Sequence, residues 1–196
     1  MPDQNSWTLA DFSFLNQHRA PAYACGMKIL TVLLFMAVVL SCAAQTDQQD
    51  VSPSQLKALL DLPIEQAVQK RNLYKAPLKV AYARQSSLAG KDCVSEADHG
   101  QQPFNICIGQ AYEQAHKDYA TFYNNLQMLC HSQDELIALQ MSEASWMSYR
   151  ENAMKAAQVT WPDGTASSGV VGRVYLSLVR DRMNELYETY DLNISH

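Results

Sequence analysis

Apolar residues recur at steps of three, four or seven along three stretches in the second half of the chain. The first stretch runs from Ile108 to Leu129, the second occupies residues 133–158, and the third runs from Leu176 to Tyr190. Such steps place the apolar side chains on one face of a helix. We therefore predict an all-α fold in which three long helices form a three-helix bundle, with shorter N-terminal helical segments packed on it.

Capping and breaking residues mark the expected ends of these helices. Asn105 is the predicted N-cap of the first helix, and Ser132 with Glu135 has the spacing of a capping box that opens the second. The Pro-Asp-Gly sequence at 162–164 should end the second helix, and the small residues 167–169 offer caps for the third.

The signals are weaker in the segment that precedes this half. Pro53 and Pro63 can each open a helix, which gives the candidates 54–60 and 63–71. Residues 78–83 fit either a short strand or a further helix, because periodicity does not separate the two. The stretches rich in polar and turn-forming residues, which we predict as loops, are 86–90 and 95–103.

A short apolar run near the start of the chain has the pattern of a signal peptide. Lys28 precedes the run 29–40, which is too short to cross a bilayer as a helix but fits the apolar core of such a peptide. We therefore expect export, with Met27 as the true start and residues 1–26 as an over-extended start. The alternative is an uncleaved anchor with a short tail.

The sequence Val39-Leu40-Ser41-Cys42 resembles a bacterial lipobox, so Cys42 is the candidate lipidation site. Ordinary cleavage after Ala43 or Ala44 would instead release a protein without a lipid anchor. Under either interpretation the protein is exported, to the periplasm or to the envelope membrane as a lipoprotein. The expected divisions of the chain are 1–26 (over-extended start or tail), 27–44 (signal peptide), 45–53 (polar tether), 54–91 (N-terminal segment) and 92–192 (helical domain).

Composition limits the kinds of partner. The net charge is -5, the pI is about 5.5, and the Lys and Arg residues are scattered, so a nucleic-acid partner is not expected. A mild negative charge favours encounter with a cationic protein. Membrane contact is expected only through the candidate lipid anchor.

Three of the five cysteines fall in the predicted helical domain. In an oxidising envelope we expect a disulfide, with Cys93 and Cys107 as the favoured pair, although the sequence permits other pairings. Cys130 is then predicted to be a small buried residue, because no His or acid stands at metal-ligand spacing from it. We predict no metal site and no cofactor.

Charged and aromatic residues share the core face of the second helix. Glu143, Trp146 and Arg150 lie at steps of three and four, and Tyr149 and Arg182 are further members of the candidate group. One interpretation is a recognition cluster. The favoured interpretation is a hydrogen-bonded polar clasp, in which Glu143 pairs with Arg150 or Arg182.

Three groups of residues carry a family resemblance. Asp92-Cys93 with Asn105-Ile106-Cys107, the stretch Trp146 to Glu151, and Arg182 to Leu186 resemble the motifs of the LprI-type family. This family consists of small exported proteins named for a mycobacterial lysozyme-inhibitor lipoprotein. The chain departs from it at Glu143, where the family has Gln, and at Met154 and Val174, which align with two family cysteines.

The resemblance implies an exported envelope binding protein that inhibits lysozyme-type peptidoglycan hydrolases. The alternative is a structural or interaction protein of the envelope without inhibitory activity. An enzyme is not expected, because the sequence has no nucleophile with an adjacent base, no metal-ligand set and no phosphate-binding loop.

Overall fold

The computed structural model describes residues 48–162, 164 and 166–195, which lie in one compact unit, Thr46–His196. The predicted leader, with Met27 and Cys42, lies outside the described residues. The fold is all-α, as predicted, and the described residues contain no strand. The helices are α2 (Pro53–Leu60), α3 (Ile64–Leu88), α4 (Val94–Ala97), α5 (Gln101–Gln127), α6 (Gln133–Thr160), α7 (Ala166–Thr189) and α8 (Asp191–Ser195).

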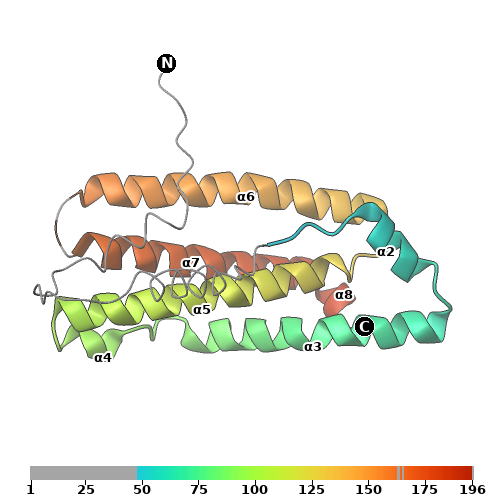
Figure 1. The fold of residues 1–196 in the computed structure, drawn as a ribbon, viewed down its shortest axis with the longest axis horizontal. Coiled ribbons are helices and arrows are strands. Elements are labelled where there is room, and N and C mark those ends of the chain that lie inside the picture. The colour runs from blue at the N-terminus through green and yellow to red at the C-terminus, as the bar shows by residue number, and fades with distance from the viewer. Residues whose placement is uncertain (1–47, 163, 165, 196) are drawn as a thin grey trace, which may run out of the picture. The chain divides into compact units, whose positions relative to one another are not determined.

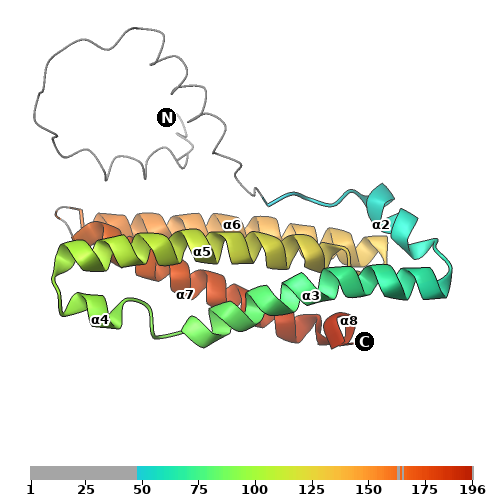
Figure 2. The same cartoon turned by 60° about the horizontal axis from the view of Figure 1, so that its bottom comes forward.

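The long helices α3, α5, α6 and α7 run side by side, and each is antiparallel to the one before it (Figure 1). Helix α5 packs on both α3 and α7, whereas α6 packs mainly along α7. The short helix α4 lies against the beginning of α5, and α2 contacts α3 and α6 at the other end (Figure 2). The bundle therefore places α5 and α7 at its centre.

Helix α3 is much longer than the predicted segment 63–71, because it continues through Pro77 to Leu88. A proline in a helix interior removes one backbone hydrogen bond and normally bends or ends the helix. Here burial of Leu78 and Ala81 beyond the proline offsets that cost. Residues 78–83, which fit strand or helix in the sequence, are helical.

The predicted N-cap of the first long helix is wrong. Helix α5 begins at Gln101, and Asn105 lies within it, where its side chain accepts a hydrogen bond from Gln101 Nε2 at 2.8 Å. Pro103 stands in the first turn, whose N–H groups have no partner inside the helix, so it does not interrupt α5. The loop predicted over 95–103 is accordingly shorter, because α4 covers Val94–Ala97 and α5 already begins at Gln101.

The capping box predicted for α6 is half formed. Ser132 Oγ accepts from the backbone N–H of Glu135 at 3.1 Å, but the Glu135 carboxylate accepts from the backbone N–H of His131 instead of Ser132. A second carboxylate oxygen of Glu135 accepts from Asn193 Nδ2, at 2.7 Å. The complete reciprocal box occurs at α2, between Ser52 and Gln55.

The core lies between α3, α5 and α7 and is closed on one side by α6. Its largest fully buried side chains, each less than 2% exposed, are Tyr119, Tyr123, Tyr175, Phe122, Leu56, Leu78, Leu126, Leu129, Leu136, Leu139, Met183 and Ile194. Helix α6 contributes only Leu136, Leu139 and Glu143 as buried residues, all in its first half. Its second half is therefore only partly covered by the bundle.

A glycine on α7 permits the close approach of α7 to α5. A Cβ atom added at Gly172 would stand 2.3 Å from Ile108 Cγ2, which is far inside van der Waals contact. A Cβ atom added at Gly109, on α5, would meet nothing within 4 Å, so this position has room for a side chain.

Gly172→Ala is expected to destabilise the fold by about 1–3 kcal/mol, because the helices must move apart to admit the methyl group. The matched control Gly109→Ala should be neutral or stabilising by up to about 1 kcal/mol, since alanine favours a helix interior over glycine. Urea unfolding of the two variants measures the difference. Equal stabilities would contradict the close helix approach.

Candidate functional site

The central feature of the candidate site is a carboxylate buried between helices. Glu143, on α6, is 2% exposed and its two oxygens both lie 2.7 Å from Tyr119 Oη on α5, so the hydroxyl can donate to either. Glu143 Oε2 also lies 3.4 Å from Arg182 Nε on α7. A buried charge persists only with such partners. The favoured sequence interpretation, a clasp that includes Glu143 and Arg182, corresponds to this arrangement.

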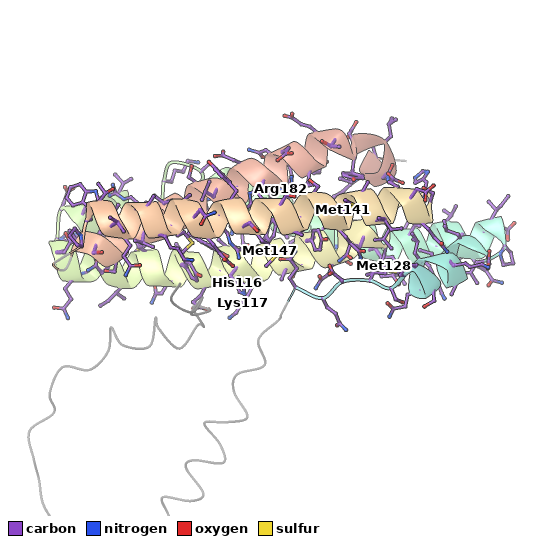
Figure 3. All side chains as sticks on the ribbon, turned by 90° about the horizontal axis from the view of Figure 1, so that it is seen from above. His116, Lys117, Met128, Met141, Met147 and Arg182 are labelled. Carbon is purple, nitrogen blue, oxygen red and sulfur yellow. A yellow bond between two sulfur atoms is a disulfide. The ribbon has the colours of Figure 1, made fainter. Side chains whose placement is uncertain are left out.

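Arg182 connects the buried carboxylate with the surface. Its side chain is 3% exposed, and its guanidinium donates from Nη2 to Ser142 Oγ at 2.8 Å and from Nη1 to Glu185 Oε2 at 3.0 Å. Figure 3 shows Arg182 at the boundary between α6 and α7. Each named residue of the Arg-x-x-Glu-Leu motif at 182–186 thus has a physical role. Arg182 and Glu185 form an ion pair, and Leu186 is buried in the core.

Burial sets the protonation of this cluster. Desolvation and the neighbouring Glu143 charge raise the pKa of Tyr119 well above its ordinary value, so its hydroxyl keeps its proton and remains a donor. Burial alone would lower the pKa of Arg182, but its hydrogen bond to Glu185 and the nearby Tyr119 and Glu143 raise it. The Glu143 carboxylate is therefore surrounded by a neutral hydrogen-bond donor, Tyr119, and a permanent cation, Arg182.

Trp146 lies within this cluster. Its ring centroid is 5.0 Å from that of Tyr119, and the guanidinium carbon of Arg182 lies 5.9 Å from the Trp146 ring. Arg150 Cζ lies 5.1 Å from the same ring. The structure therefore brings together Glu143, Trp146, Arg150 and Arg182 of the candidate group. The fifth member, Tyr149, is 59% exposed and lies outside the buried cluster.

Residues 48–51, part of the predicted polar tether, are bound between α5 and α6. Gln48 Nε2 donates to Glu143 Oε1 at 2.8 Å, and the backbone N–H of Val51 donates to Gln127 Oε1 at 2.8 Å. Gln127 Nε2 donates to the Gln49 carbonyl at 3.0 Å, and Gln140 Nε2 donates to the Val51 carbonyl at 2.9 Å. This contact is not predictable from the sequence, because two glutamines in separate helices carry no periodic signal.

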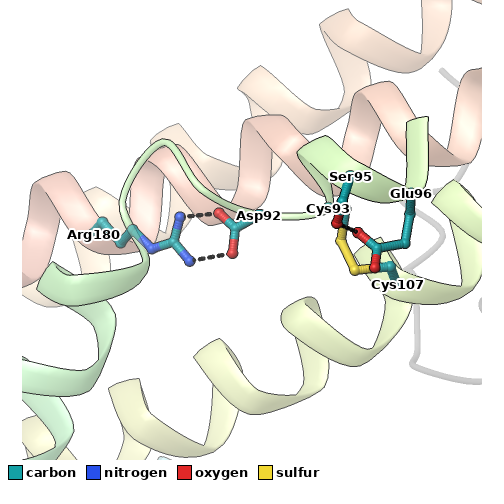
Figure 4. The surroundings of a disulfide bond; sticks show 6 residues. All are labelled: Asp92, Cys93, Ser95, Glu96, Cys107 and Arg180. Atoms are coloured by element: carbon teal, nitrogen blue, oxygen red, sulfur yellow. Dashed lines mark hydrogen bonds and ion pairs between the residues drawn. A yellow bond between two sulfur atoms is a disulfide. The ribbon is translucent and has the colours of Figure 1, made fainter. Parts of the chain in front are cut away.

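A second polar network, also missed in the sequence, joins α3, α5 and α7. Gln85 Nε2 donates to Asp118 Oδ2 at 2.7 Å, and Gln85 Oε1 accepts from Arg180 Nε at 3.2 Å. Arg180 also forms a two-pronged ion pair with Asp92, the residue before Cys93 (Figure 4). The network ties the connection between α3 and α4 to the centre of the bundle.

The predicted disulfide between Cys93 and Cys107 is confirmed, with a sequence separation of 14 (Figure 4). It joins the residue before α4 to α5. Cys130 is free and buried, as predicted. Burial, with a contribution from Glu135, raises the pKa of the Cys130 thiol to about 12, so the nucleophilic thiolate is scarce at neutral pH.

Within the described residues, no three His, Cys, Asp or Glu side chains gather in a way that could hold a metal ion. The helices of the described part are also not long and apolar enough for any of them to cross a membrane. The cluster around Glu143 can hold α5, α6 and α7 in register, because its hydrogen bonds and ion pair join all three helices.

Residues 93–186, just under half of the chain, match the family model described as "Lysozyme inhibitor LprI". No curated protein and no solved structure gives a significant match. The matched residues begin at the disulfide and end at the buried Leu186, so they include the Glu143–Arg182 pair. The resemblance predicted from the motifs is confirmed, and the helical region from Cys93 to Leu186 is an LprI-type region.

Proposed function

We propose that the protein is an exported envelope protein that binds and inhibits a lysozyme-type peptidoglycan hydrolase. The observation that carries the proposal is the match of residues 93–186 to the lysozyme-inhibitor family model. A disulfide that closes this region suits an oxidising compartment outside the cytoplasm. The signal-peptide pattern at 28–44, with Cys42 as the lipid site, supplies the route to that compartment.

The proposed contact surface is formed by exposed residues of α6 and α7. Ser142 and Tyr149 are seven residues apart, about two helical turns, so they lie on one side of α6. Arg182 contacts both Ser142 and Glu185, which places these two exposed residues on the same side of the bundle. We call the α6–α7 face the set Ser142, Tyr149, Asp181, Glu185 and Glu188.

Charge makes this face suitable for a cationic enzyme. Asp181, Glu185 and Glu188 are exposed and follow one another at steps of four and three along α7, so their carboxylates form one row. Opposite charges across an interface raise the association rate and orient the partners. The exposed ring of Tyr149 adds the kind of aromatic anchor that interfaces favour.

In this proposal the candidate residues divide into two roles. Glu143 and Arg182, being buried, hold α6 against α7 and do not touch the enzyme, and Trp146 packs beside them. Tyr149 touches the enzyme directly. The clasp thus fixes the geometry of the acidic row, as a rigid support does in a preorganised interface.

A lysis assay tests the function. Purified protein recovered from the envelope is added in excess to a lysozyme acting on a suspension of cell walls, and turbidity is followed over time. We expect clearance to slow in proportion to the protein added. Undiminished clearance would instead favour a structural or interaction role in the envelope without inhibition.

The charge row gives a sharper prediction. The double variant Asp181→Lys/Glu188→Lys should weaken inhibition at least tenfold, which corresponds to about 1.4 kcal/mol of binding free energy. The control Glu65→Lys/Asp98→Lys makes the same change in net charge at exposed acids on α3 and beside α4. If the control loses as much inhibition as the α7 variant, the loss comes from the change in net charge and not from the α6–α7 face.

A further inference from the structure

We propose that Arg150 binds the carboxylate of a small ligand at the partly covered second half of α6. The side chain of Arg150 is half-buried, and its guanidinium carbon lies 5.1 Å from the centroid of Trp146 and 5.8 Å from that of Tyr175. Two aromatic rings, one from α6 and one from α7, thus border a single cation. This inference does not rest on lysozyme inhibition and stands or falls separately.

Arg150 differs from Arg84, Arg180 and Arg182 in what it pairs with. Arg173 also lies over a ring, that of Phe104, but its side chain is exposed. Arg84, Arg180 and Arg182 each form an ion pair with a carboxylate. Among the described residues, Arg150 is within ion-pair distance of no carboxylate, and it contacts ring faces instead. A ring face attracts the cation but does not satisfy the N–H donors at the guanidinium edge, of which there are five.

The side chains next to Arg150 are aromatic and contact one another. The rings of Tyr112 and Tyr175 are 4.0 Å apart, and Tyr175 Oη lies 3.0 Å from His116 Nδ1. Burial raises the pKa of Tyr112 and of Tyr175, so both hydroxyls stay protonated and neutral. The exposed carboxylate of Glu113 also raises the pKa of both tyrosines, so the site combines the fixed positive charge of Arg150 and neutral aromatic side chains with one carboxylate nearby.

A carboxylate is the group that this arrangement fits. Its two oxygens match the parallel N–H donors of a guanidinium, and the pair is stronger where rings exclude water. A net charge of -5 opposes the approach of an acidic protein, whereas a single carboxylate on a small molecule meets little of that repulsion. We therefore assign the site to a small acidic molecule, either an acidic sugar or the free C-terminus of a short peptide.

Nuclear magnetic resonance of the arginine Nε–Hε groups tests the assignment, with the signal of Arg150 identified from its loss in Arg150→Gln. The probes are N-acetylmuramic acid, N-acetyl-dialanine with a free carboxylate, and N-acetylglucosamine, which has no carboxylate. We expect a saturable shift of the Arg150 signal with one of the two acids at roughly millimolar concentration. Which acid responds distinguishes the sugar source from the peptide source.

Variants separate a built site from a surface charge. Arg150→Gln should weaken binding of the responding acid at least tenfold, with Arg150→Lys intermediate because it keeps the charge and loses the planar fork. The matched control is Arg173→Gln, which removes an exposed arginine lying 4.5 Å from the Phe104 ring and should leave binding unchanged. An equal response to N-acetylglucosamine, no saturable shift with either acid, or binding only of a glutamate-rich peptide would overturn the proposal.

Discussion

Arg182→Leu is expected to lower the free energy of unfolding by about 3–5 kcal/mol. The substitution leaves Glu143, which is 2% exposed, without its cationic partner, and the cost of a buried unpaired carboxylate exceeds the loss of the pair itself. Tyr119 and Gln48 still donate to Glu143, which keeps the cost within this range. Urea unfolding followed by circular dichroism measures the change.

The matched control removes the exposed partner of the same arginine. Glu185→Gln breaks the pair with Arg182 at a side chain that is 61% exposed, so it should cost less than about 1 kcal/mol. A loss of similar size in both variants would mean that Arg182 acts through the surface pair. A loss below about 1 kcal/mol in Arg182→Leu would contradict the clasp as a stabilising feature.

Loss of the Cys93–Cys107 disulfide should lower the free energy of unfolding by about 3 kcal/mol, because an unfolded chain without this closed loop has a higher conformational entropy. The double variant Cys93→Ser/Cys107→Ser should unfold at a lower urea concentration than the oxidised protein. Reduction of the wild-type protein should give the same shift.

Reduction of the double variant is the control for this prediction. Because its remaining described cysteine, Cys130, is buried and free, a reductant should leave its unfolding midpoint unchanged. If the double variant unfolds at the wild-type midpoint, the Arg180–Asp92 ion pair beside the bridge would be sufficient to hold the α3–α4 connection.

Local periodicity accounts for what the sequence could predict of the fold. The stripes beginning at Ile108 and Leu176 are the core faces of α5 and α7. Such a stripe is predictable because the spacing of apolar residues depends on one helix alone and not on its neighbours. The predicted segment 63–71 ends too early, since Pro77 suggests a helix end that burial of Leu78 and Ala81 overrides. Asn105 lies inside α5 because the helix begins four residues earlier, at Gln101, and Pro103 in its first turn interrupts no backbone hydrogen bond of the helix.

The candidate site was predictable where one helix carries it and not where helices meet. Glu143, Trp146 and Arg150 share a face of α6, and their spacing of three and four residues is enough to predict this. Their partners Tyr119 and Tyr175 come from α5 and α7, where each resembles an ordinary core aromatic. The contacts of Gln127 and Gln140 with residues 49–51 depend on tertiary placement, for which amide side chains give no periodic signal.

Titration calorimetry of the envelope-derived protein with a cationic lysozyme tests the central claim most directly. The proposed function predicts a one-to-one complex whose affinity falls as salt is added, because the acidic row of the α6–α7 face is screened. The Asp181→Lys/Glu188→Lys variant should bind at least tenfold more weakly in the same titration. Absence of heat at low salt, from protein whose folding is verified by circular dichroism, would contradict the claim that this chain binds lysozyme.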